Sequence, residues 1–291
     1  MADLSVLDDL IIIPEAKIDF SQIAKDSYID PSEEIKPQPV AISVGTSLYK
    51  GKSFAIPFGS YGDFSCIVGA SKSRKTFFKS MIIAGYIGGQ SNILNPSIQG
   101  HKTKDKFVIE FDTEQSKFHA QRVVRRVCDM VGGNYDQYKT FALRGYAPKE
   151  RFEFIDWIIN ESEYRNNIGL MSIDGYVDLV TDFNSLEQAS GLTDKLLEWT
   201  SKGNMHITGI LHKNFGTSKP VGHVGSSVLK KAETVVFIEN DKDTGYTKVN
   251  CEYSRNIPFE DLCFGVNEDW LPHEIDNSLF GSMPNNKTPN F

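Results

Sequence analysis

A short loop between an apolar run and a helix-forming segment limits the possible folds of this 291-residue chain more than any other part of its sequence. The loop, residues 69–76, reads Gly-Ala-Ser-Lys-Ser-Arg-Lys-Thr, and it follows the strand-like run 64–68. Small residues let consecutive backbone N–H groups turn toward phosphate oxygens, and the next helix adds the positive end of its dipole. The order strand, loop, helix with this spacing is typical of a P-loop and predicts nucleoside triphosphate binding.

The residue types in the loop predict separate roles. Lys75 would reach the outer phosphates, and the Thr76 hydroxyl would ligate Mg²⁺. Arg74 stands where a second glycine is expected, so a positive φ there would be strained. The alternative is a basic turn between a core strand and a helix. The residues predicted to bind ATP are Gly69, Ala70, Ser71, Lys72, Ser73, Arg74, Lys75, Thr76 and Phe77.

Short apolar runs alternate with helix-period segments through the middle of the chain, which predicts an α/β fold with a mainly parallel sheet covered on both faces. The predicted strands are 64–68, 107–111, 169–173, 206–211 and 234–238, and the predicted helices are 76–86, 116–131 and 186–200. After the last strand, Asp243-Thr244-Gly245 and the segment 246–253 predict an antiparallel hairpin.

The two ends of the chain differ from the middle. Residues 1–38 mix acidic residues with short apolar clusters and end in a proline-spaced stretch, which predicts an acidic arm that docks or stays mobile. Residues 271–291 are polar and contain prolines, which predicts a disordered tail. One ATPase domain is expected over residues 39–270.

The composition excludes several classes of protein. No apolar run reaches the roughly 18 to 20 residues of a membrane helix, and the short N-terminal apolar stretch lacks the flanks of a signal peptide, so a cytoplasmic protein without membrane contact is expected. The scattered cysteines form no CxxC pair, which argues against a zinc site or disulfide framework and predicts reduced, mostly buried thiols. Of the net charge of −7, residues 1–36 contribute −6, so the charge of the remainder neither predicts nor excludes a nucleic-acid partner.

Carboxylates follow two of the predicted strands. The run 107–111 continues into Asp112-Thr113-Glu114, and the run 168–173 ends in Asp174. At the carboxyl edge of a parallel sheet these groups would face the same crevice as the P-loop. We expect Asp174 to hold Mg²⁺ through its bound water. For Asp112 and Glu114, a solvated strand end or helix N-cap is the alternative.

The segments 67–76 and 107–114 resemble the RecA-like ATPases, whose recombinases carry a similar Asp-x-Glu after the strand that corresponds to 107–111. The resemblance covers roughly residues 50–265 and implies a RecA-like P-loop NTPase fold with ATP and Mg²⁺ as ligands. In that family the last glutamate orients and deprotonates the attacking water. The resemblance therefore implies Glu114 as catalytic base, with Asp112 as the fallback.

Later segments resemble hexameric replicative helicases of the plasmid RepA and DnaB types, as encoded on bacterial mobile elements. In these helicases, a polar residue after the strand that follows the magnesium-binding strand senses the γ-phosphate, and in the RepA type this residue is a histidine. The corresponding strand here is 206–211, so the resemblance implies His212 as the sensor. The stretch 225–236 resembles the glycine-serine turn and short helix of these helicases. For His212, a plain polar cap of the strand is the alternative.

The segment Tyr253-Ser254-Arg255-Asn256 resembles the place where these hexameric helicases insert an arginine finger into the neighbouring subunit. The resemblance implies a ring-shaped homo-oligomer in which Arg255 neutralises charge on the transferred phosphoryl group. A surface arginine beside Glu252 or Glu260 is the alternative.

In the same helicases, the loops after the magnesium-binding and sensor strands line a channel for single-stranded DNA. The corresponding loops here are 175–185 and 213–224. The loop 213–224 carries two lysines and an aromatic residue, which suit contact with a single strand. The loop 175–185 carries Asp178 and Asp182, which oppose DNA binding. We therefore expect an ATP-hydrolysing motor on single-stranded DNA, with a replication or mobilisation protein as a further partner. The alternatives are a non-motor ATPase that loads or regulates a partner protein, and a nucleotide-binding switch with little turnover.

Overall fold

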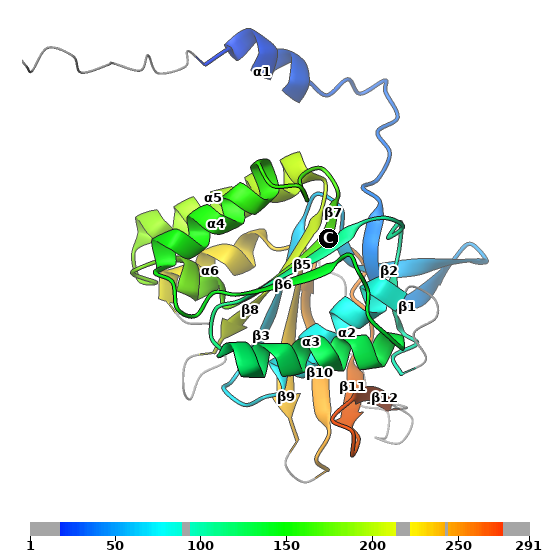
Figure 1. Ribbon diagram of the computed structural model, residues 1–291. Coiled ribbons are helices and arrows are strands. Elements are labelled where there is room, and N and C mark those ends of the chain that lie inside the picture. The colour runs from blue at the N-terminus through cyan, green and yellow to red at the C-terminus, as the bar shows by residue number, and fades with distance from the viewer. Residues whose placement is uncertain (1–17, 89–93, 214–221, 242–243, 276–291) are drawn as a thin grey trace, which may run out of the picture. The chain divides into compact units, whose positions relative to one another are not determined.

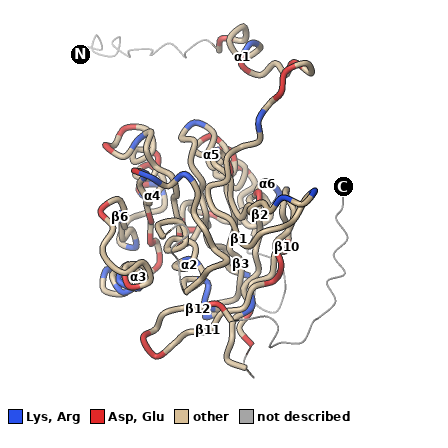
Figure 2. The backbone as a smooth tube through the Cα atoms, turned by 90° about the vertical axis from the view of Figure 1, so that its right-hand side faces the viewer, with Lys and Arg blue, Asp and Glu red and all other residues tan. Residues whose placement is uncertain are grey.

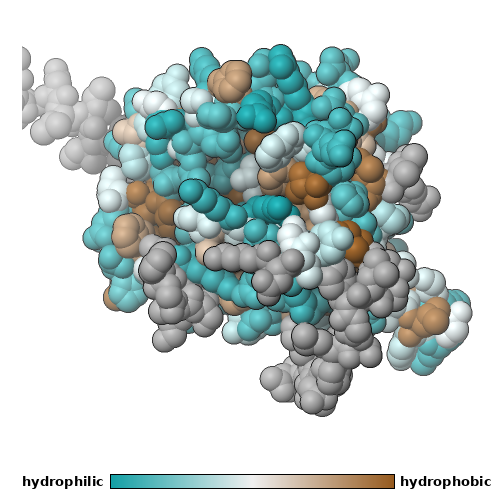
Figure 3. Space-filling view, turned by 90° about the horizontal axis from the view of Figure 1, so that it is seen from below, coloured by the Kyte–Doolittle hydropathy of each residue, from teal (hydrophilic) through white to brown (hydrophobic). Residues whose placement is uncertain are grey.

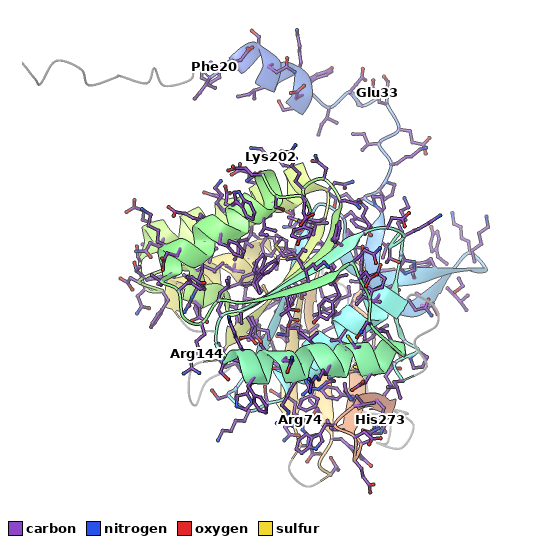
Figure 4. All side chains as sticks on the ribbon, in the orientation of Figure 1. Phe20, Glu33, Arg74, Arg144, Lys202 and His273 are labelled. Atoms are coloured by element: carbon purple, nitrogen blue, oxygen red, sulfur yellow. The ribbon has the colours of Figure 1, made fainter. Side chains whose placement is uncertain are left out.

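The computed structural model describes residues 18–88, 94–213, 222–241 and 244–275, and the chain divides into two units, Met1–Pro37 and Gln38–Phe291. In the first unit, α1 (Phe20–Ser27) begins where the side chain of Asp19 accepts a hydrogen bond from the Gln22 N–H. None of the residues of α1 is buried, and Phe20 projects from the helix (Figure 4).

The second unit is an α/β structure built on a large mixed sheet (Figure 1). The sheet has nine strands in the order β12-β11-β10-β9-β3-β8-β7-β5-β6. From β9 to β6 the pairings are parallel, whereas β10, β11 and β12 extend the sheet with antiparallel pairings. The bounds are β3 (Phe64–Gly69), β5 (Phe107–Asp112), β6 (Tyr138–Ala142), β7 (Ile168–Asp174), β8 (His206–His212), β9 (Thr234–Asn240), β10 (Thr247–Ser254), β11 (Leu262–Val266) and β12 (Pro272–Ile275).

Helices cover both faces of this sheet, and each face has its own hydrophobic core (Figure 1). One core contains buried residues of α2 (Lys75–Gly88) and α3 (Lys117–Val131), such as Met81 and Val127. The other contains buried residues of α4 (Pro148–Asn160), α5 (Leu186–Gly203) and α6 (Gly222–Lys231), such as Ile158, Leu196 and Val228. Because both faces are covered, the central strands are apolar along nearly their whole length.

A second, smaller sheet packs on the α2 side of the molecule. Its order is β2-β1-β4, with bounds β1 (Val40–Tyr49), β2 (Lys52–Ser60) and β4 (Ile98–Gly100). Ile42 and Phe58 from this sheet belong to the same core as Phe78 of α2. The small sheet therefore buries the outer side of the helix that follows the loop 69–76.

The strands and helices expected from the apolar periodicity are confirmed, each with small shifts of its ends. The expected hairpin is also confirmed, as β9 and β10 pair in antiparallel fashion. The second unit begins at Gln38, close to the expected boundary. The expected domain end at residue 270 needs correction, because β12 (Pro272–Ile275) pairs with β11 within the segment assigned to the tail.

Two expectations from composition can be compared with the structure. Cys66, Cys251 and Cys263 are buried and Cys128 is half-buried, which agrees with the expected buried thiols. Within the described ranges, no helix is both long enough and apolar enough to cross a membrane.

Candidate functional site

The carboxyl ends of four parallel strands converge on one pocket. In the register of the sheet, Gly69 at the end of β3 pairs with His212 at the end of β8, and Asp112 pairs with Asp174. The pocket has a volume of about 250 Å³. Its lining contains Ile210 and the predicted site residues Lys72, Ser73, Arg74, Lys75, Thr76, Phe77, Glu114, Asp174 and His212, but not Gly69, Ala70 or Ser71 of the predicted loop.

The loop after β3 is shaped by Gly69. A Cβ atom at this position would lie 2.5 Å from the Ser73 Oγ and 2.8 Å from the Ile238 carbonyl oxygen, so only glycine fits. The N–H groups of Phe77 and Phe78 both bond back to the Arg74 carbonyl, which starts the helical ladder of α2. The first N–H groups of a helix have no partner within that helix, so those at the start of α2 can donate to an anion in the pocket.

Lys75 is buried at the first position of α2. Its Nζ donates to the carbonyl oxygens of Gly69 at 3.0 Å and Ala70 at 2.6 Å. Burial lowers the pKa of Lys75, and the carboxylates of Glu114 and Asp174 partly offset this effect. The ammonium group therefore lies inside the loop with neutral carbonyl oxygens as its acceptors. An anionic ligand in the pocket would give it a stronger hydrogen-bond acceptor than a carbonyl.

Arg74 has a positive φ of 67°, the conformation expected from the sequence to be strained at this position. Its side chain forms hydrogen bonds from Nη1 to the Gly245 carbonyl at 2.7 Å and to the Thr247 Oγ1 at 3.3 Å. The guanidinium thereby ties the loop to the β9–β10 hairpin (Figure 4).

Seen from below, the surface of the molecule is mainly hydrophilic with separate apolar patches (Figure 3).

Glu114 and His212 come from different strands and form a direct pair. His212 Nε2 lies 2.7 Å from Glu114 Oε1, and because an ionised carboxylate only accepts hydrogen bonds, the ring nitrogen donates. This hydrogen bond lowers the pKa of Glu114, with burial acting in the opposite direction. Asp112 instead caps the following turn, since its Oδ1 accepts from the N–H groups of Glu114 and Gln115.

Asp174 has a partner that the sequence did not suggest. Lys79 Nζ lies 2.7 Å from Asp174 Oδ2 and 2.6 Å from Glu110 Oε1, and the Lys79 side chain is fully buried. The sequence contains one signal for this contact, a lysine on the core face of the predicted helix 76–86. A buried lysine needs a buried counter-charge, so this position could have indicated an acidic partner.

The residues at the pocket fit a magnesium ion that is shared with a substrate. Thr76 and Asp174 both line the pocket and offer a hydroxyl and a carboxylate. Over the described ranges, no group of three or more His, Cys, Asp and Glu side chains could hold a metal by itself. Mg²⁺ is commonly bound through one or two carboxylates together with substrate phosphates and water, so such a donor set suits it.

Arg255 lies away from this pocket in its own chain. Its Nη1 lies 2.9 Å from Asp63 Oδ2, and its Nη2 donates to the Lys231 carbonyl, so its partner is neither Glu252 nor Glu260. Asp63 immediately precedes β3, whose other end carries the pocket. A strand of this length spans roughly 20 Å. Arg255 and the pocket of the same chain therefore lie at opposite ends of β3.

The structure describes only part of the segments expected to contact DNA. In the loop 213–224, residues 214–221 lie outside the described residues. Lys213 Nζ lies 3.1 Å from Glu239 Oε1 and 4.4 Å from the centroid of the Phe237 ring, so this cation already has partners within the chain. Basic and acidic residues are interspersed along the backbone (Figure 2).

A scan against protein-family models finds no match for the chain. A search of the curated proteins finds no match either.

Proposed function

We propose that the chain is an ATP-hydrolysing enzyme with a RecA-like P-loop domain. One observation carries this proposal: Lys75, Thr76, Glu114, Asp174 and His212 line a single pocket although they come from four separate segments of the chain. The sequence and its family resemblance predict a role for each of these residues, whereas Arg255, which the resemblance also implies, lies away from the pocket. A basic turn without a ligand would not require acidic and imidazole groups from other strands to converge on it.

The residues of the pocket suit an in-line attack of water on a γ-phosphate. Glu114 accepts the proton of the water, and the hydrogen bond from His212 keeps its carboxylate ionised and oriented. Lys75 places its ammonium group at the outer phosphate oxygens, where negative charge develops. Thr76 and Asp174 hold Mg²⁺, which supplies positive charge to the same phosphate oxygens when it is bound.

The choice of Glu114 over Asp112 as the base follows from their surroundings. Glu114 lines the pocket, whereas one oxygen of Asp112 is engaged by two backbone N–H groups. Burial also raises the pKa of Asp112, although Lys79 opposes this shift. Glu114 therefore combines access to the pocket with an ionised carboxylate.

The wider proposal is a ring-forming motor of the replicative-helicase type that acts on single-stranded DNA. Its support is the order of the motifs along the chain, in which the predicted sensor, His212, follows the Asp174 strand. Arg255 would act in a neighbouring subunit, and half of its side chain is exposed, at 51%. In an assembly, that neighbour would have to compete with Asp63 for the guanidinium group.

A second candidate function is a non-motor ATPase that acts on a partner protein. The observation that favours it is the arm, in which Ile18, Phe20, Ile23, Tyr28 and Ile29 are exposed apolar or aromatic residues. Exposed apolar residues of this kind are typical of an element that docks on another protein. Both candidates predict hydrolysis, but only the motor predicts strand displacement.

The test is phosphate release from ATP by the full chain, with and without single-stranded DNA. Wild type should turn over, and Glu114→Gln should be slower by about 10²-fold or more, because a general base contributes on that order. Lys75→Ala should lose turnover through weak binding. If the folded wild type releases phosphate no faster than both variants, the proposed enzyme is wrong, and a nucleotide-binding switch is favoured.

A further inference from the structure

Lys79 is a fully buried cation that contacts Asp174, a residue of the pocket lining. It lies one helical turn after Lys75 on α2, so the two side chains leave the same side of the helix. Its Nζ bridges Glu110 of β5 at 2.6 Å and Asp174 of β7 at 2.7 Å. Lys79 is not among the residues that line the pocket, whereas Asp174 is.

Stability alone explains this arrangement poorly. Taking an ammonium group and two carboxylates out of water costs several kcal/mol per ion, and well-packed apolar side chains in their place are often neutral or stabilising. The second unit already has an extensive apolar core on this side, with Phe78, Met81 and Ile82 of the same helix fully buried. A buried ion pair at this position therefore points to a role in the adjacent site.

The bridge is anchored at the end away from the pocket. The second oxygen of Glu110 accepts hydrogen bonds from the Tyr138 hydroxyl and from Thr140 Oγ1, both on β6. Glu110 is consequently fixed by the neighbouring strand, and it fixes Lys79 in turn. The chain of contacts ends at Asp174, where Lys79 holds one carboxylate oxygen and leaves the rest of the group at the pocket.

We propose that Lys79 is a positioning residue that orients the Asp174 carboxylate toward the magnesium ion of the bound nucleotide. With Oδ2 held by Lys79, Asp174 presents a single free oxygen, so it contacts the ion or one of its waters in one fixed geometry. This inference rests on the proposed function. It adds that magnesium affinity depends on a lysine that touches neither the metal nor the substrate.

The experiment measures the affinity of a slowly hydrolysed ATP analogue by calorimetry over a series of Mg²⁺ concentrations, together with the melting temperature. Lys79→Met in a Glu110→Gln background removes one buried charge of each sign, and Glu110→Gln alone, which retains the Lys79–Asp174 pair, is its reference. The Mg²⁺ concentration at half-saturation should rise about tenfold from the reference to the double variant, because partners of metal ligands contribute on that order. Affinity for the analogue without Mg²⁺ should change little.

Lys195→Met is a matched control, since Lys195 also bridges two carboxylates, Asp156 and Glu198, on the opposite side of the sheet. It should leave the Mg²⁺ half-saturation unchanged. Should the double variant fail to fold, Lys79→Arg keeps the charge but displaces the Asp174 carboxylate, and should raise the half-saturation with the melting temperature retained.

Two outcomes overturn the inference, and they can be told apart. A folded Lys79 variant whose Mg²⁺ half-saturation stays within twofold of its reference shows that Lys79 has only a structural role. If the folded wild type binds no analogue at any Mg²⁺ concentration, the proposed function fails and the inference fails with it.

Discussion

Arg74 is the residue at which the loop departs most clearly from the usual motif, and its conformation has a measurable cost. A non-glycine residue at a φ of 67° is strained, typically by about 1 kcal/mol or more. The two hydrogen bonds from its guanidinium to the β9–β10 hairpin stabilise the same conformation. The arginine therefore combines a strained backbone with a link that glycine could not make.

The strain at position 74 can be separated from the link by two substitutions. Arg74→Ala loses the hydrogen bonds and keeps the strain, so it should lower the free energy of unfolding by about 1 to 2 kcal/mol. Arg74→Gly also loses the bonds but relieves the strain, and should be more stable than the alanine variant by about 1 kcal/mol. Urea denaturation measures the difference. Equal stability of the two variants would show that position 74 is not strained.

His212 controls the protonation of Glu114 in the proposed mechanism. The hydrogen bond from His212 is the main cause of the lowered pKa of Glu114, and burial acts against it. In His212→Ala only the charges of Lys75 and Lys79 still oppose the effect of burial, so the pKa of Glu114 should rise, and the acid limb of the pH profile of kcat/KM should move to higher pH. His212→Asn keeps a donor and should show a smaller move. An acid limb at the same pH in wild type and His212→Ala would contradict the assigned base.

At the scale of elements, β8 is packed tightly against the helix η2 (Tyr176–Leu179) that follows β7. A Cβ atom on Gly209 would lie 2.1 Å from the Tyr176 ring, which is itself fully buried. Gly209→Ala should therefore lower the free energy of unfolding by about 1 to 3 kcal/mol through overpacking.

Gly191 on α5 is the matched control for this packing. It is exposed, and no atom lies within 4 Å of a Cβ at this position. Gly191→Ala should stabilise the protein by about 0.5 to 1 kcal/mol, because alanine has the higher helix propensity. Thermal denaturation distinguishes the two substitutions, and destabilisation by both would show that the local packing at β8 is not the cause.

The elements that could be predicted from sequence are those with an unambiguous apolar pattern. The central strands, such as β3 and β7, are buried on both faces and appear as continuous apolar runs. The pair β1 and β2 is harder to find, because register shifts interrupt its alternation and its outer half is exposed. β12 is difficult to predict from sequence because it has only four residues and lies within a polar terminal segment.

At the scale of the whole molecule, the buried His206 links stability to pH. Its ring is held between the Ser60 carbonyl and the Ser65 hydroxyl, and burial lowers its pKa to about 4 from the ordinary 6.5. Between these two pH values the unfolded chain binds a proton that the folded chain does not, so stability falls as pH decreases through this window. The loss from this residue should reach about 3 kcal/mol near pH 4.

His206→Gln tests this linkage, because glutamine does not titrate. Urea denaturation between pH 7 and 4 should show a shallower loss of stability for the variant than for wild type. A variant with the same slope as wild type would assign the acid sensitivity to other groups.

The candidate site was largely predictable because its residues lie in short motifs that each end a strand. What the sequence could not provide was which of them touch. The pairing of Glu114 with His212 and of Asp174 with Lys79 depends on the strand order, which places β8 and β7 between β3 and β5. These contacts arise only when segments separated by 98 and 95 residues meet at the carboxyl ends of the strands.

We propose above all that the loop 69–76 and the groups around it bind a magnesium-bound nucleoside triphosphate. Calorimetric titration of the folded full chain with a slowly hydrolysed ATP analogue and Mg²⁺ tests it most directly. We expect one saturable site per chain, with affinity lowered at least about tenfold in Lys75→Ala. Absence of saturable binding by folded wild type at millimolar analogue, or equal affinity in Lys75→Ala, would contradict it.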